Sequence, residues 1–115
     1  MAQEAVALTK AYDVVKWIME RAAKFPKSRR YSLGARMEDI ALDILMRLVE
    51  ANYSKQKAGL LQQVNHDIDK MRYLVRLGKD FALLSNRQYE YISRELIELG
   101  RQVGGWSRHA KDRDA

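Results

Sequence analysis

The sequence predicts an all-α protein, an up-down-up-down antiparallel four-helix bundle. Three observations predict this class. Residues that favour helices, such as Ala, Leu, Glu, Lys, Arg and Gln, are abundant, whereas the 115 residues include 6 Gly and 1 Pro. Apolar residues recur at spacings of three and four in four long segments. The connections between these segments are short, so consecutive helices should pack as antiparallel neighbours.

The first two helices are separated by Pro26. Because Pro26 has no amide hydrogen and disfavours helical geometry at Phe25, the first helix should lie within residues 5–24. Ser32 is placed to cap a second helix, which should end near Tyr53. The apolar stripe of the first helix is Leu8, Ala11, Tyr12, Val15, Ile18, Met19 and Ala22. The stripe of the second is Leu33, Met37, Ile40, Ala41, Ile44, Leu45 and Leu48.

A third helix should span about residues 57–83. Its apolar positions repeat as in the seam of a helix bundle. They are Leu61, Val64, Ile68, Met71, Val75, Gly78 and Ala82, with Leu60, Leu74, Leu77 and Phe81 widening the stripe. Gly78, and Gly100 in the next helix, are expected to permit close helix approach.

The fourth helix has the clearest beginning. Ser85 and Gln88 match a capping box, in which each side chain bonds the backbone of the other residue. The core stripe that follows is Tyr89, Ile92, Leu96, Leu99 and Val103. Gly104-Gly105 should end the helix. We therefore expect a bundle domain over residues 1–106 and a charged, disordered tail over residues 107–115.

Catalytic and metal sites are not expected. The chain has no Cys, so disulfides and thiolate metal sites are excluded. His66 and His109 lie far apart in the sequence, and no Glu-x-x-His pair or phosphate-binding glycine loop is present. The longest uncharged run, residues 58–66, is far shorter than the roughly 20 residues of a membrane span. We expect a cytoplasmic protein that is not an enzyme and uses no cofactor or metal.

The charge balance indicates a polyanionic partner. The formal net charge is +6 and the isoelectric point is about 9.7. Residues 25–32 carry three basic and no acidic side chains, and residues 54–84 carry six basic and three acidic ones. Two clusters are the candidate phosphate contacts of a nucleic-acid-binding surface. They are Lys27, Arg29 and Arg30 in the connection after Pro26, and Arg72, Arg76 and Lys79 on one face of the third helix.

A further set of cations follows the fourth helix. Arg87, Arg94, Arg101 and Arg108 are spaced by seven residues, so at least the first three share one helix face, with Tyr91 between the first two. These guanidiniums would meet phosphates while the ring stacks a base. Alternatively, Glu90 and Glu98 are placed to pair with Arg94 and Arg101, which would make the same face a solvated surface or a subunit contact. Both interpretations stay open.

Extended runs of the sequence resemble the accessory variability determinant (Avd) family. The runs are KFPKSRRYSLG at 24–34, ALDIL at 41–45 with EANY at 50–53, LVRLGKD at 74–80, LSNRQY at 84–89 and GRQVGGW at 100–106. The resemblance covers about residues 17–106. The related ribosomal RNA intervening-sequence proteins share the Phe-Pro entry to the second helix. They usually carry an Ile-Pro-Ser-Asn-like segment where this chain has Ile44-Leu45-Met46-Arg47.

Resemblance to the Avd family implies a non-enzymatic accessory protein of a diversity-generating retroelement. It implies a four-helix bundle that assembles as a homopentamer, binds RNA and DNA through basic surfaces, and associates with the reverse transcriptase during mutagenic retrohoming of a template RNA. Two alternatives remain. One is an intervening-sequence-type bundle protein, and the other is a protein-interaction scaffold that binds nucleic acid only weakly.

Overall fold

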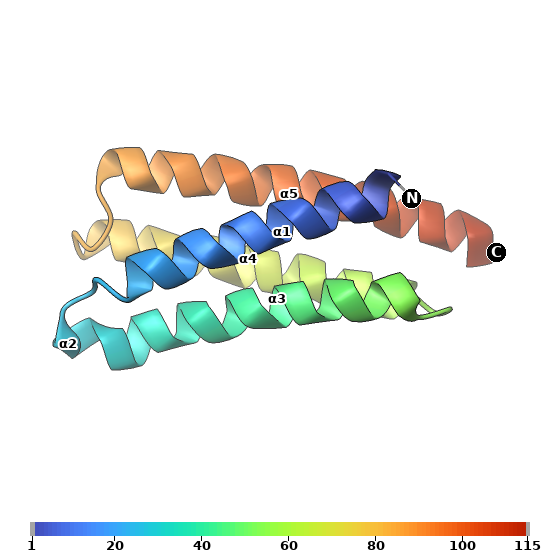
Figure 1. Cartoon of the computed structure of the whole chain (residues 1–115). Helices are drawn as coiled ribbons and strands as arrows, with labels where there is room; N and C mark the ends of the chain where they lie inside the picture. Colours follow the sequence, from blue (N-terminus) through green and yellow to red (C-terminus); the bar gives the residue numbers. More distant parts are fainter. Residues whose placement is uncertain (1, 115) are drawn as a thin grey trace.

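The protein is an antiparallel bundle of long helices, as the sequence predicts. The computed structural model describes residues 2–114, with side chains described from residue 4 to residue 111. Within this range, the long helices are α1 (Ala2–Ala22), α3 (Ala35–Tyr53), α4 (Ala58–Asp80) and α5 (Asn86–Asp114). Successive long helices run in opposite directions, and α5 closes the bundle by packing against both α1 and α4 (Figure 1).

The apolar stripes of the four long helices meet in one core. Burial of these side chains removes apolar surface from water, which is the main stabilising contribution to a bundle of this kind. The predicted stripes of the second to fourth helices are largely confirmed. The largest side chains less than 2% exposed are Trp106, Ile18, Met37, Ile44, Leu48, Leu61, Met71, Ile92, Leu96, Leu99, Val64 and Val75.

On α1 and at the end of α4, the predicted stripes include residues that lie outside the core. Tyr12 is 57% exposed and Met19 is 39% exposed, whereas Ala7 and Val14 are buried in their place. The buried face of α1 is therefore rotated from the predicted one, because small Ala residues on the true face give a weak hydrophobic signal. Leu77 and Phe81 are also exposed, so the predicted stripe is wrong at these positions as well.

The connection after Pro26 is helical from its first residue. Short α2 (Lys27–Arg29) begins directly after Pro26, and a π-helical turn, η1 (Arg30–Gly34), leads into α3. The Pro26 carbonyl accepts hydrogen bonds from the backbone N–H groups of Arg29 and Arg30. Ser32 is therefore not a helix cap, contrary to the prediction. Proline disfavours a continuing helix but is well suited to the start of one.

A Schellman motif ends α4. The N–H of Leu83 bonds the carbonyl of Gly78 at 2.8 Å, and the N–H of Ala82 bonds the carbonyl of Lys79 at 2.9 Å. Ala82 takes the left-handed position of this motif, with φ at 58°. The helix consequently stops at Asp80, and Ala82 is exposed instead of belonging to the predicted core stripe.

The start of α5 confirms the predicted capping box. The Ser85 N–H donates to Gln88 Oε1 at 2.9 Å, and the Gln88 N–H donates to Ser85 Oγ at 3.1 Å. This reciprocal pair satisfies two backbone donors at the beginning of α5.

The predicted end of the last helix at Gly104-Gly105 is wrong. Helix α5 continues through both glycines to Asp114, so the segment expected to form a tail from Ser107 is helical as far as that residue, and Ala115 lies outside the described residues. Trp106 is 1% exposed and Ala110 is 4% exposed. Burial of these two side chains in the core stabilises the continuation of α5 past the glycines.

Candidate nucleic-acid interface

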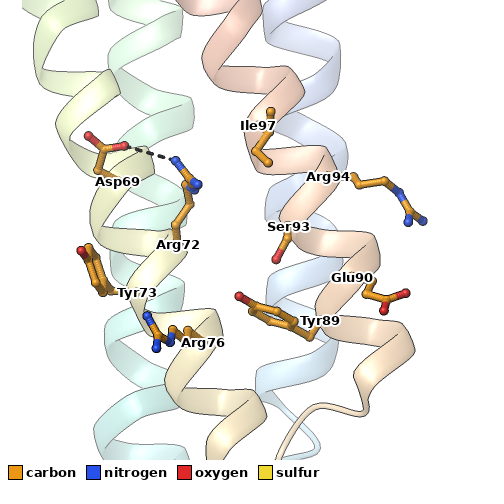
Figure 2. A pocket seen from close by; sticks show the side chains of 9 residues that line it. All are labelled: Asp69, Arg72, Tyr73, Arg76, Tyr89, Glu90, Ser93, Arg94 and Ile97. Atoms are coloured by element: carbon orange, nitrogen blue, oxygen red, sulfur yellow. Dashed lines mark ion pairs between the residues drawn. The ribbon is translucent and has the colours of Figure 1, made fainter.

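A groove of about 650 Å³ runs between α4 and α5 (Figure 2). It joins residues that the sequence placed in two separate candidate sets, because Arg72 and Arg76 of α4 line it together with Arg94 of α5. The other lining residues are Asp69, Tyr73, Tyr89, Glu90, Ser93 and Ile97. The groove thus combines cationic, aromatic and hydroxyl side chains, with one acidic residue from each helix.

The cations of α4 are only weakly neutralised by acidic side chains. Arg72 lies 4.0 Å from Asp69, and both side chains are more than half exposed, so solvent screens this contact strongly. Among the described residues, Arg76 forms no ion pair. The Lys79 ammonium lies 5.0 Å from the centroid of the Tyr89 ring, a cation–π contact that leaves its charge in place. These three residues therefore present positive charge at or beside the groove.

On α5, the arginines spaced by seven differ in their surroundings. Arg87 and Arg94 are exposed, and Figure 2 shows Arg94 extending from the side of α5 that is turned away from α4. Arg101 instead donates to Glu98, with 3.0 Å between Nε and Oε1. Hydrogen bonds from Arg101 first, and from Gln102 second, lower the pKa of Glu98 to about 2. The predicted Glu98–Arg101 pair is therefore present on the outer face of α5.

Tyr91 lies at the side of α5 that faces α1. Its ring centroid is 5.7 Å from that of Trp17 on α1, with 40° between the ring planes, and the residue is 40% exposed. Lys10 of α1 also reaches α5, where its Nζ lies 2.9 Å from a Glu95 carboxylate oxygen. Tyr91 is thus engaged in the contact between α1 and α5, which occupies part of the ring surface expected to stack a base.

The remaining predicted cluster lies at one end of the bundle. Lys27 and Arg30 are exposed on α2 and η1, and Arg30 donates to the Phe25 carbonyl at 3.3 Å. The Arg29 guanidinium lies 4.6 Å from the centroid of the Phe81 ring, which follows the end of α4. This contact places the Lys27, Arg29 and Arg30 cluster beside the end of α4 that carries Lys79. We call this region, Lys27 to Arg30 with Lys79 and Phe81, the basic end.

The importance of Phe81 was missed from the sequence, which assigned it to the core stripe. Its exposure depends on where α4 stops, and the left-handed Ala82 that stops the helix has no residue-type signal of the kind glycine gives. The aromatic residue beside a basic cluster is therefore visible only in the folded chain.

The described part of the chain has neither a metal-binding cluster nor a membrane-spanning helix. Within it, no three His, Cys, Asp or Glu side chains are grouped to hold a metal ion. None of its helices combines the length and apolar character needed to cross a membrane.

The fold and these surfaces define an all-helical bundle protein with a cation-lined groove and a basic end. The sequence matches the family model described as bAvd-like over residues 5–110, so the chain belongs to the bAvd-like family. This match confirms the resemblance drawn from the sequence and supports an accessory protein of the Avd type. A search among curated proteins finds no match.

Proposed function

We propose that this protein is a non-enzymatic nucleic-acid-binding accessory of a diversity-generating retroelement. In this proposal it acts in the cytoplasm with the reverse transcriptase and the template RNA during mutagenic retrohoming. Membership of the bAvd-like family supports the retroelement role. The observation that carries nucleic-acid binding is the row formed by Arg72 and Arg76 in the groove between α4 and α5 and by Lys79 beside it, where acidic neighbours neutralise little of their charge.

The mechanism follows from the chemistry of these side chains. Arg and Lys contact phosphate oxygens, and each contact releases counterions from the nucleic acid, which makes the affinity fall as salt rises. Such contacts set the position of the strand without selecting its sequence. Sequence choice would then belong to the polymerase and to base pairing, while this protein holds RNA or DNA near the enzyme.

A homo-oligomer, with five subunits as the family resemblance implies, is part of the proposal. One exposed face of α3 supports it. Leu42, Met46 and Val49 are 38%, 55% and 37% exposed, and their spacing by four and three places them on one side of the helix. A row of large apolar side chains on an outer helix surface is suited to contact with another protein surface, here a second copy of the chain.

The test removes the two α4 cations that line the groove, Arg72 and Arg76, together with Lys79 beside it. Replacing Arg72, Arg76 and Lys79 with Gln should weaken binding of labelled RNA and DNA oligonucleotides in fluorescence anisotropy. The slope of log affinity against log salt should flatten by about one unit per lost phosphate contact. A matched control replaces the exposed Lys16, Lys55 and Lys111 with Gln, which removes the same formal charge outside the groove and the basic end.

The outcomes separate the proposal from non-specific attraction. If the groove variant binds like the parent at every salt concentration, the assignment of this face is wrong. If both triple variants lose affinity equally, net charge and not the groove determines binding, which also contradicts the assignment. A reverse transcriptase gene and a template repeat beside this gene would test the retroelement role independently.

A second candidate function is a protein-interaction scaffold. The observation that favours it is the Glu98–Arg101 pair, because a carboxylate interleaved with the arginines of α5 lowers their attraction for phosphates. If the parent protein forms its oligomer but its affinity for RNA hardly changes between low and physiological salt, the scaffold becomes the better function.

A further inference from the structure

Phe81 has an exposed aromatic side chain, and hydrogen bonds hold its backbone. It is 53% exposed although it directly follows the long helix α4. Its N–H bonds the carbonyl of Leu77 at 2.9 Å, and the Schellman motif formed by Ala82 and Leu83 holds the backbone immediately after it. The ring is thus presented to solvent by a hydrogen-bonded turn, so little conformational freedom of the backbone would be lost on binding a ligand.

The surroundings of Phe81 are strongly cationic. The Arg29 guanidinium lies over the ring at 4.6 Å from its centroid, and residues 24–34 contain four basic and no acidic side chains. The acidic residue next to the ring in sequence is Asp80, which is exposed and is preceded by Lys79.

We propose that Phe81 is a stacking platform for an unpaired base, with Arg29 and Arg30 holding the adjoining phosphates. This inference rests on the proposed nucleic-acid-binding function and deepens it, since it makes single-stranded RNA or DNA the preferred ligand of the basic end. Stacking on an aromatic ring tolerates every base, because each base has a π face. In a duplex those faces are covered by neighbouring base pairs, so stacking on Phe81 adds no affinity for a duplex.

The charge around the ring favours nucleic acid over a protein partner. Protein interfaces are depleted of Lys at their core, and a docking site for an apolar protein surface would have to bury several of these cations away from water. A nucleic acid supplies both a flat ring for Phe81 and anionic groups for Lys27, Arg29 and Arg30. Arginine also stacks on aromatic planes, so a base can share the ring with the Arg29 guanidinium.

The test compares Phe81→Leu with the parent, using a single-stranded oligonucleotide and a duplex of the same sequence. Leu keeps an apolar side chain but removes the π face. Affinity for the single strand should fall by at least about fivefold, whereas affinity for the duplex should stay the same. Phe81→Trp, which keeps a larger stacking surface, should bind the single strand at least as tightly as the parent.

A matched control is Tyr53→Leu. Tyr53 is 82% exposed and is the last residue of α3, which ends on the side of the bundle opposite the end of α4 that precedes Phe81 (Figure 1). This variant should bind both oligonucleotides like the parent. Because Phe81 and Tyr53 are both exposed, neither Leu variant should alter the helical content, which circular dichroism would verify.

A direct readout uses 2-aminopurine placed within the single strand. Its fluorescence should be quenched by stacking on Phe81 in the parent and recover in Phe81→Leu. The inference is overturned if Phe81→Leu binds both oligonucleotides like the parent and leaves the quenching unchanged, even where the groove cations still control affinity. It is also overturned if Phe81→Leu changes only the oligomeric state, which would make the ring a protein contact. If the parent binds no nucleic acid, the proposed function fails as well.

Discussion

Arg47 on α3 and Asp67 on α4 form an ion pair across the two helices, and Asp67 is 3% exposed. The other carboxylate oxygen of Asp67 lies 3.4 Å from Gln63 Nε2 and 3.8 Å from Lys70 Nζ. A carboxylate removed from water depends on partners of this kind. The pair therefore favours one axial register between α3 and α4, since a slip along the helix would leave Asp67 without Arg47.

Arg47→Met should lower the free energy of unfolding by about 2 kcal/mol, because Asp67 would stay buried with weaker partners. The double variant Arg47→Met with Asp67→Leu should recover most of that loss, since no buried charge remains. Urea denaturation of the parent, both single variants and the double variant gives the coupling energy directly. Additive effects of the two substitutions would show that the pair contributes nothing.

Ala82→Gly should stabilise the protein by about 1 kcal/mol, because an alanine is strained at a φ of 58° and glycine is not. Ala82 is exposed, so the substitution removes no core contact. The control is Ala5→Gly, an exposed position within α1, which should destabilise by up to about 1 kcal/mol. Thermal denaturation should show shifts of opposite sign, and a drop in melting temperature for Ala82→Gly would contradict this account.

Gly78 and Gly100 should respond differently to alanine. A Cβ at Gly100 would meet Ile68 Cγ2 at 3.9 Å, an ordinary contact, so Gly100→Ala should gain up to about 1 kcal/mol of helix propensity. A Cβ at Gly78 would lie 3.2 Å from Leu84 Cδ1, and Leu84 is 3% exposed. Gly78→Ala should therefore lose most or all of the same gain. Equal stabilisation of the two variants in urea denaturation would show that Leu84 moves aside freely.

The close contact at Gly78 is made with another residue of the same chain, not with a second subunit. Gly78 was expected to permit close packing, and its neighbour is Leu84 in the connection to α5. It consequently offers no surface to a second subunit, whereas Gly100 is partly exposed. If Gly100→Ala weakens assembly while stabilising the isolated bundle, Gly100 lies at a subunit contact.

The pair of Glu98 and Arg101 should make a small contribution that depends on pH. Since the pKa of Glu98 is lowered from 4.5 to about 2 in the folded chain, the contribution is fully present above about pH 4.5 and is lost as the pH falls towards 2. Glu98→Gln should thus differ from the parent at pH 7 and approach it only near pH 2 in chemical denaturation. A difference that stays constant across this range would show that the pair does not stabilise the fold.

Assembly should be visible by light scattering on a sizing column. We expect a homo-oligomer, with a mass near five subunits, and we expect Arg94→Gln with Arg101→Gln to loosen it, because Glu98 would lose its cationic partner and Glu90 a nearby cation. Met46→Gln, which places a polar group in the apolar row on α3, should also weaken assembly. A clean monomer at tens of micromolar would contradict both the oligomer and the assigned α3 contact.

Much of the fold follows from local patterns in the sequence. The stripe of α3 and the capping box of Ser85 and Gln88 depend on neighbours within one or two helical turns, so spacing alone predicts them. The end of α5 depends on distant contacts. The predicted stop at Gly104-Gly105 fails because Trp106 and Ala110 find burial in the core, which local propensity does not describe.

The sequence predicts which residues form the candidate surfaces, but it does not predict how residues from different helices are placed relative to one another. The shared face of Arg72, Arg76 and Lys79 follows from helix geometry, whereas the groove that Arg72, Arg76 and Arg94 line depends on how α4 and α5 pack side by side. The Arg29–Phe81 contact requires both the helical start at Lys27 and the turn at Ala82. The left-handed conformation of Ala82 is not signalled by its residue type.

Because the long helices alternate in direction, the start of α1 and the end of α5 lie at the same end of the bundle. Helix α1 begins and α5 ends on the side of the bundle opposite the basic end (Figure 1). An affinity tag, a surface anchor or a fluorophore fused at either terminus therefore projects away from Phe81 and its cations.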